Sequence, residues 1–192
     1  MRSKQASFLH GGANVAPSAE RRTLLRAALS LAAGVGLGSW SNTASANALA
    51  VGKPAPELVL HTLDGTSISS KELTGKVVIL TFWATWCGPC LTELPLLSEY
   101  LTRHRKQGLE ILGFSLDGAE NLPEVRRFAS RLNFPVGLLG SPWAGDYGRM
   151  WRIPVSFTID RNGVLADNGW NEDDPVWTVE RLERIVTPLL AK

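Results

Sequence analysis

The apolar and polar positions after residue 50 alternate between two patterns, which predicts alternating strands and helices. Lys76–Trp83 and Leu109–Leu116 are continuous apolar and β-branched runs, as in strands that are buried on both faces. Leucines at helical spacing predict a helix over Pro89–Arg105. A second helix is expected at Leu122–Leu132 and a third strand at Pro135–Leu139. Strands separated by helices in this order favour parallel pairing.

Short extended runs on either side of turn residues predict one hairpin before this core and one after it. The first joins Glu57–His61 to Thr66–Ser69 through a Leu-Asp-Gly turn. The second joins Val155–Ile159 to Val164–Asn168 through Asp-Arg-Asn-Gly, a strong turn signal. Because the second hairpin adds antiparallel strands to the parallel ones, the expected sheet is mixed.

The remaining segments complete an α/β fold, a three-layer sandwich in which helices flank the mixed central sheet. A loop with a short helical turn is expected over Ser141–Trp151. Asp174 is a candidate N-cap and proline is favourable at the first helical position, so a last helix is predicted from Pro175 to Leu190.

The first 46 residues have a different pattern, typical of an export signal peptide. Basic residues in Glu20–Arg26 precede a weakly apolar stretch at Ala27–Gly38 and a small-residue cleavage site that ends at Ala46. The adjacent arginines resemble a twin-arginine signal. We therefore expect an exported, periplasmic chain with one domain over residues 47–192. Retention as an N-terminal membrane anchor is the alternative, although the apolar part is shorter than the ~20 residues that a bilayer span needs.

The charge of the expected mature domain argues against a nucleic-acid partner. The whole chain has 20 basic and 18 acidic residues, but the leader contains five of the basic residues and one of the acidic ones. The remainder therefore carries a net charge of −2. With 44% hydrophobic and 20% charged residues, the chain has the composition of an ordinary globular protein.

Cys87 and Cys90 are the only cysteines. Their spacing suits neither a disulfide that stabilises the fold nor a metal site with four protein ligands. A disulfide between residues three apart closes a very short loop, so it constrains the unfolded chain little. Zinc and iron–sulfur sites need about four ligands, and the histidines of the mature domain, His61 and His104, are distant in sequence. Copper(I) accepts two thiolates, but Met150 is the single methionine there to support it. No cofactor and no metal are expected.

Dithiol–disulfide exchange is the chemistry that the position of the cysteines favours. Cys87 lies where a buried strand ends and a helix begins, so free backbone N–H groups and the helix dipole should stabilise its thiolate. Cys90, one turn later, is placed to resolve a mixed disulfide. Pro89 is tolerated in the first turn, whereas Pro95 is expected to kink the helix.

Trp-Cys-Gly-Pro-Cys after an apolar strand resembles the thioredoxin superfamily, and most closely its periplasmic TlpA/ResA-like thiol–disulfide oxidoreductases. FWATWCGPC followed by Glu93 and Pro95, a strand–helix unit inserted around Leu116–Leu139, and IPVSFTIDRNG together cover most of residues 50–190. The resemblance implies a thioredoxin-like fold with an N-terminal hairpin. It also implies a redox-active disulfide between the two cysteines.

The resemblance assigns substrate-binding roles to residues around the cysteines. Pro154 matches the cis-proline of the superfamily, beside which Ile153 would offer its backbone groups to a substrate strand. Trp86, Gly88 and Pro89 are expected to contact the substrate as well.

A proton-transfer role falls to Glu93, which resembles the active-site glutamate of ResA-like proteins, because Thr81 stands where thioredoxins have a buried aspartate. A half-buried carboxyl beside the Cys90 thiol would have a raised pKa, suited to accepting its proton near neutral pH. The alternative interpretation is an exposed helix glutamate.

Two tryptophans, an arginine and an acidic run near the motif have no assigned role in the reaction. Trp83 is expected in the core. Trp151 and Arg152 depart from the small residue often found before the cis-proline, which leaves the substrate preference open. The acidic run Asn171–Asp174 either borders the active surface or is a solvated loop and helix cap.

Gly-Pro between the cysteines resembles the reducing members of the superfamily, so reduction of protein disulfides is expected, with apocytochrome c as a candidate substrate. The resemblance implies that a membrane thiol reductant of the DsbD/CcdA type recharges the protein, which is expected to be a monomer. A copper chaperone and a net disulfide oxidant are the alternatives. A peroxiredoxin is excluded, because P-x-x-x-T-x-x-C would need proline and threonine where Leu80 and Ala84, or Trp83 and Cys87, stand.

Overall fold

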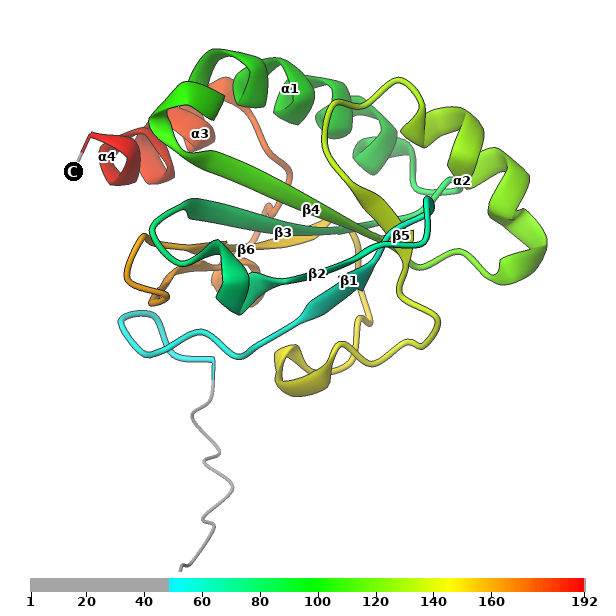
Figure 1. Ribbon diagram of the computed structural model, residues 1–192, viewed down its shortest axis with the longest axis horizontal. Coiled ribbons are helices and arrows are strands. Elements are labelled where there is room, and N and C mark those ends of the chain that lie inside the picture. The colour runs from blue at the N-terminus through cyan, green and yellow to red at the C-terminus, as the bar shows by residue number, and fades with distance from the viewer. Residues whose placement is uncertain (1–48, 192) are drawn as a thin grey trace, which may run out of the picture. The chain divides into compact units, whose positions relative to one another are not determined.

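The computed structural model describes residues 49–191 and contains a five-stranded mixed sheet, a separate hairpin and four α-helices (Figure 1). The strands are β1 (Val59–His61), β2 (Ser67–Ser69), β3 (Val77–Trp83), β4 (Leu109–Ser115), β5 (Val136–Leu138), β6 (Val155–Ile159) and β7 (Leu165–Asn168). The helices are α1 (Gly88–His104), α2 (Leu122–Ala129), α3 (Val179–Ile185) and α4 (Thr187–Leu190).

The order of strands in the sheet is β5-β4-β3-β6-β7, with β3 at the centre. Strands β3, β4 and β5 are parallel, as the connecting helices require, and β6 and β7 are antiparallel to their neighbours. Strands β1 and β2 form an antiparallel hairpin of their own. The predicted mixed sheet and both predicted hairpins are therefore confirmed.

Two hydrophobic clusters fill the spaces on either side of the sheet, and β3 contributes to both. Side chains alternate between the faces of a strand, so Val77, Ile79 and Trp83 join the cluster that α1 covers. The even-numbered neighbours from Val78 to Phe82 join the cluster on the other face. Figure 1 shows α1, α3 and α4 on one side of the sheet and the β1-β2 hairpin on the other. This explains why every residue of β3 is buried.

The prediction of a last helix from Pro175 to Leu190 is wrong at its start and in its middle. Helix α3 begins at Val179, with Thr178 as the N-cap, because the N–H of Trp177 is bonded to a side chain of another helix. The helix also ends at Ile185 and restarts as α4, since Pro188 has no N–H to continue the ladder. Asp174 caps a turn, by accepting the N–H of Val176, and no helix.

Smaller differences concern the second helix and the leader. Helix α2 ends at Ala129, three residues before the predicted end, and Leu132 closes a tight turn by donating to the Ala129 carbonyl. The predicted turn in 141–151 is present as a short 3-10 helix at Gly145–Tyr147. The predicted signal peptide lies outside the described residues. Within residues 49–191, no helix is both long and apolar enough to cross a membrane.

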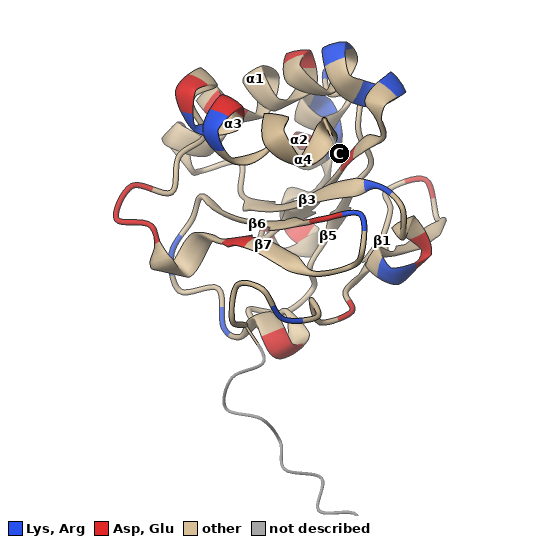
Figure 2. Cartoon of the chain, turned by 90° about the vertical axis from the view of Figure 1, so that its left-hand side faces the viewer, with Lys and Arg blue, Asp and Glu red and all other residues tan. Residues whose placement is uncertain are grey.

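The charged side chains follow the outer parts of the domain. In the view of Figure 2, basic and acidic residues both lie along the helices and loops, while the central strands carry few of them. An exception is Asp167 on β7, which is buried and pairs with Arg181 of α3.

Candidate active site

Cys87 and Cys90 form a disulfide at the junction of β3 and α1, with an S–S distance of 2.00 Å. Cys87 is the N-cap of α1, and its Sγ accepts the backbone N–H of Cys90 at 3.3 Å. The first turn of α1 contains no acidic residue. An N–H group and the positive end of the helix dipole therefore both act on Cys87 Sγ, and both stabilise a thiolate there.

The two sulfurs differ in their access to solvent. The Cys87 residue is 6% exposed and Cys90 is fully buried. Gly88 and Pro89, which lie between them, are exposed, and Pro89 occupies the first turn as predicted. A partner protein therefore meets Cys87 first, while Cys90 is reachable only from within the motif.

The Ile153–Pro154 peptide bond is cis, as expected, and lies at the same end of the sheet as the cysteines. In the register of β6 against β3, Val155 pairs with Phe82, so Pro154 comes level with the last residue of β3. The side chain of Ile153 packs against the hydrophobic cluster that contains both cysteines. The structure therefore brings the two predicted motifs together.

Glu93 is buried in α1, one turn after Cys90, and its exposed fraction is 1%. The interpretation of Glu93 as an exposed helix residue is wrong. Its Oε2 accepts the backbone N–H of Trp177 at 2.8 Å, while Oε1 is buried with no hydrogen-bond partner among the described residues. Burial raises the pKa of Glu93 to about 7, against the opposing effects of the Trp177 N–H and the Arg181 charge. A carboxyl with this pKa can take up or release a proton near neutral pH.

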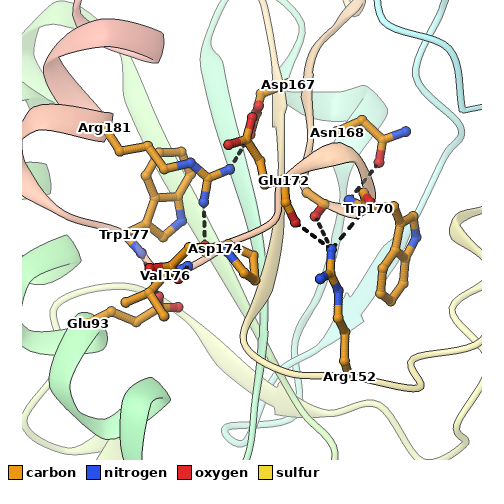
Figure 3. A network of polar contacts seen from close by, with 12 residues as sticks. Glu93, Arg152, Asp167, Asn168, Trp170, Glu172, Asp174, Val176, Trp177 and Arg181 are labelled. Carbon is orange, nitrogen blue, oxygen red and sulfur yellow. Dashed lines mark hydrogen bonds and ion pairs between the residues drawn. The ribbon is translucent and has the colours of Figure 1, made fainter.

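Trp177, Arg181 and Asp167 form a chain of contacts that starts at Glu93, and sequence reasoning missed all three (Figure 3). Arg181 lies over the indole ring of Trp177, 4.2 Å from its centroid, and forms an ion pair of 2.9 Å with Asp167. No sequence signal links these residues to Glu93, because Trp177 is 84 positions away and Arg181 falls in a helix with an ordinary mixture of charges.

A third buried acid, Asp117, was also missed and holds the loop that leads to Cys87. Asp117 accepts the backbone N–H of Thr85 at 2.8 Å and its hydroxyl at 2.6 Å, and it also accepts the hydroxyl of Ser115 at 2.7 Å. Asp117 follows the end of β4, next to the end of β3, which is why it reaches this loop. These bonds fix the backbone immediately before Trp86.

Trp86 stands out from this loop and is 66% exposed, while its role as a contact surface stays a prediction. Trp83 is fully buried, as predicted. Two grooves flank Trp86: one of about 470 Å³, toward Pro142 and Met150, and one of about 360 Å³, toward Arg127 of α2. The surface next to Cys87 therefore consists of an exposed tryptophan with a groove on either side.

The residues before the cis-proline are held by the loop after β7. The Arg152 guanidinium donates to the carbonyl oxygens of Gly169, Trp170 and Glu172, at 2.8–3.2 Å. Trp151 is exposed and stacks on Trp170 with ring centroids 5.4 Å apart. The acidic run 171–174 is thus tied to the segment that precedes the cis-proline (Figure 3).

Within residues 49–191, no three His, Cys, Asp or Glu side chains are grouped so that they could hold a metal ion. The site combines a disulfide, a buried carboxyl one helical turn further along α1 and a cis-proline at the same end of the sheet. Thiol–disulfide exchange is the chemistry that these parts share, and the thioredoxin-like oxidoreductases are the class of proteins that combines them with this sheet.

Comparisons with known proteins lead to the same class. Residues 51–168 match the AhpC/TSA family. The chain is 38% identical over 136 residues to the thiol-disulfide oxidoreductase ResA of Bacillus thuringiensis, which covers 69% of this chain and 75% of the relative. It is 35% identical over 151 residues to ResA of Geobacillus kaustophilus, with 76% and 86% covered.

A solved structure agrees in fold. The thioredoxin-family thiol:disulfide interchange protein of Chlorobium tepidum superposes with a TM-score of 0.61 at 29% identity, and the match covers 72% of this chain and 96% of that one. The chain therefore belongs to the AhpC/TSA family, has a thioredoxin-like fold and is a protein thiol–disulfide oxidoreductase.

Proposed function

We propose that this chain is an exported protein-disulfide reductase in which Cys87 attacks the substrate and Cys90 releases it. The observation that carries the proposal is the asymmetry of the two sulfurs: Cys87 Sγ accepts an N–H at the start of α1 and is the more exposed, while Cys90 is fully buried. The Gly-Pro pair between the cysteines supports the reducing direction, by resemblance to the reducing members of the superfamily.

The reaction consists of two exchanges that together move two electrons to the substrate. The Cys87 thiolate attacks one sulfur of a substrate disulfide, so that a mixed disulfide forms and the other substrate sulfur leaves as a thiolate. Cys90 then loses its proton to Glu93 and attacks Cys87 Sγ. The second substrate thiolate leaves, and the Cys87–Cys90 disulfide closes. Both substrate sulfurs gain a proton and leave reduced.

The substrate segment binds along the edge that the cis-proline presents. Ile153 is half-buried and packs against the cluster that contains the cysteines, and we expect its backbone groups to pair with an extended segment that carries the substrate cysteine. Trp86, Gly88 and Pro89 are exposed around Cys87 and form the remaining contact surface.

Export and partners complete the proposal. The signal peptide of residues 1–46 directs the domain to the periplasm, where a reductant has to be recharged continually. A membrane thiol reductant of the DsbD/CcdA type supplies the electrons, and the disulfide of apocytochrome c is the proposed substrate. The domain acts as a monomer. These steps rest on the resemblance to TlpA/ResA-like proteins.

A cysteine trap tests the roles of the two sulfurs. Reduced C90S protein, incubated with a protein that contains an accessible disulfide, should accumulate a mixed disulfide through Cys87, because no second thiol can resolve it. The C87S variant is the matched control and should accumulate none. Equal trapping by both variants, on non-reducing gels with mass spectrometry of the linked peptides, would overturn the assignment.

A further inference from the structure

Arg181 is a buried arginine whose surroundings are built around its charge. The residue is 3% exposed, and its guanidinium forms a 2.9 Å ion pair with buried Asp167 and donates to the carbonyl oxygen of Pro175. It also lies over the indole of Trp177, 4.2 Å from the ring centroid. A buried ion pair is a poor source of stability, because the cost of desolvating two charges offsets their attraction. This pair therefore needs a further explanation.

Arg181 contacts the segment whose backbone binds Glu93. Its hydrogen bond to Pro175 and its stacking on Trp177 fix the segment between Asp174 and α3, and the backbone N–H of Trp177 in this segment donates to Glu93 Oε2. Figure 3 shows this chain of contacts from Asp167 through Arg181 and Trp177 to Glu93.

Two charges act on the Glu93 carboxyl, and a third residue, Asp167, is paired with one of them. Arg181 of α3 favours its ionised form and Asp174 of the preceding loop opposes it, while Asp167 of β7 acts through its pairing with Arg181. Cys90 is the titratable neighbour on α1 itself and is engaged in the disulfide. Arg181 is therefore the favourable charge, and Asp167 controls how much of that charge is compensated.

We propose that Arg181, with Asp167 as its counter-ion, is a positioning residue that orients Glu93 and sets how readily it accepts the Cys90 proton. The inference rests on the proposed role of Glu93 in the exchange reaction. It assigns a task in that reaction to a charge pair on α3 and β7, whose hydrogen bonds go to each other and to the Pro175 carbonyl.

The test is to titrate the Glu93 carboxyl by NMR in the oxidised protein, in variants that change one charge at a time. R181M removes the favourable charge, so the Glu93 midpoint should rise by about one pH unit. D167N leaves Arg181 uncompensated, so the midpoint should fall. R181K keeps the charge and should stay closer to the wild type. Shifts in opposite directions distinguish an electrostatic role from a general loss of structure.

Two further variants keep the test decisive. If R181M alone fails to fold, R181M/D167N removes both charges, leaves no ion buried without its partner and should also raise the midpoint. The control is R161M, because the Arg161 guanidinium also donates to backbone carbonyls, those of Gly75, Gln107 and Leu190, but has no contact with the Glu93 segment among these bonds. R161M should lower the melting temperature and leave the Glu93 midpoint unchanged.

The pH–rate profile of disulfide reduction separates failure of this inference from failure of the proposed function. R181M and D167N should move the limb of the profile that reports Glu93 in the same directions as the Glu93 midpoint. A Glu93 midpoint that does not move in either variant overturns the role of Arg181. A midpoint that moves while E93Q leaves the pH–rate profile unchanged overturns proton transfer by Glu93, and with it the catalytic part of the inference.

Discussion

Cys87 and Glu93 lie on one helix but in opposite electrostatic environments. Cys87 Sγ is at the N-terminus of α1 and accepts an N–H, which favours its charged form. Glu93 is enclosed by the core, and burial favours its neutral form. These environments suit the two proposed roles, a thiolate at Cys87 that attacks the substrate and a carboxyl at Glu93 that can take up the Cys90 proton near pH 7.

The sequence predicts these residues because they fall in a recognisable motif at a strand–helix junction. It does not predict the groups that tune them. The partner of Glu93 is a backbone N–H, at Trp177, and backbone groups have no sequence signature. Likewise Asp117 reaches Thr85 only because β4 lies beside β3 in the folded sheet.

The buried Glu93 carboxyl should make the stability of the wild type depend on pH, and E93Q should remove that dependence. The Glu93 pKa is about 7 in the folded protein against an ordinary value of 4.5, so between these values the folded state binds the extra proton. Stability of the wild type should therefore fall as pH rises from 4.5 to 7, by about 3 kcal/mol in total. The glutamine introduced by E93Q cannot ionise, so the variant lacks this loss.

Urea unfolding of the oxidised proteins at pH 5 and pH 8 measures the difference. E93Q should have nearly wild-type stability at pH 5 and exceed the wild type at pH 8. Reduction of a protein disulfide by E93Q should also be slower and lose its dependence on the Glu93 titration. Parallel stability curves for the two proteins would show that the Glu93 carboxyl is not perturbed by burial.

At the scale of elements, prediction succeeded where packing reinforces a local pattern. Strand β3 and helix α1 were predicted to within a residue or two, because continuous burial and leucine spacing are direct consequences of their positions in the core. The start of α3 was missed because a long-range bond takes the N–H of Trp177 away from the local chain. A local helix signal at Asp174 and Pro175 could not reveal that competition.

Helix α1 contains its own weak point at Pro95. The proline is exposed, and without an N–H it cannot donate to the Leu91 carbonyl in the preceding turn. P95A should therefore raise the free energy of unfolding by about 1–3 kcal/mol. E99A, at another exposed position of α1, is the control and should change it by less than about 0.5 kcal/mol. Equal effects of the two variants in urea unfolding would show that Pro95 does not weaken the helix.

At the scale of the whole domain, the N-terminal hairpin lies against β5 at the edge of the sheet, where the two backbones approach closely. The N–H of Leu63 donates to the Val136 carbonyl at 2.9 Å. A Cβ at Gly137 would lie 1.9 Å from the His61 carbonyl oxygen, so only glycine fits there. The sequence indicates the hairpin itself, but not that it docks on β5, because nothing local specifies that pairing.

Replacing this glycine should separate the hairpin from the sheet. G137A is expected to destabilise the protein by about 1–3 kcal/mol or more, because the obstructing atom belongs to the backbone and cannot move aside. The matched control is G113A, where the nearest atoms, at 3.1 Å, belong to the side chains of Phe134 and Val136 and can shift. Thermal melts that rank G113A as the more damaging change would contradict this account.

At the scale of the whole domain, the proposed function makes the Cys87–Cys90 dithiol a reductant, and this direction of electron flow depends on its reduction potential. The reduction potential of the Cys87–Cys90 couple, measured by equilibration with glutathione or dithiothreitol, tests this directly. We predict a value between about −220 and −350 mV, which makes the dithiol form a donor of electrons to substrate disulfides. A value near about −120 mV, which is typical of a strong oxidant, would contradict the assignment as a reductase.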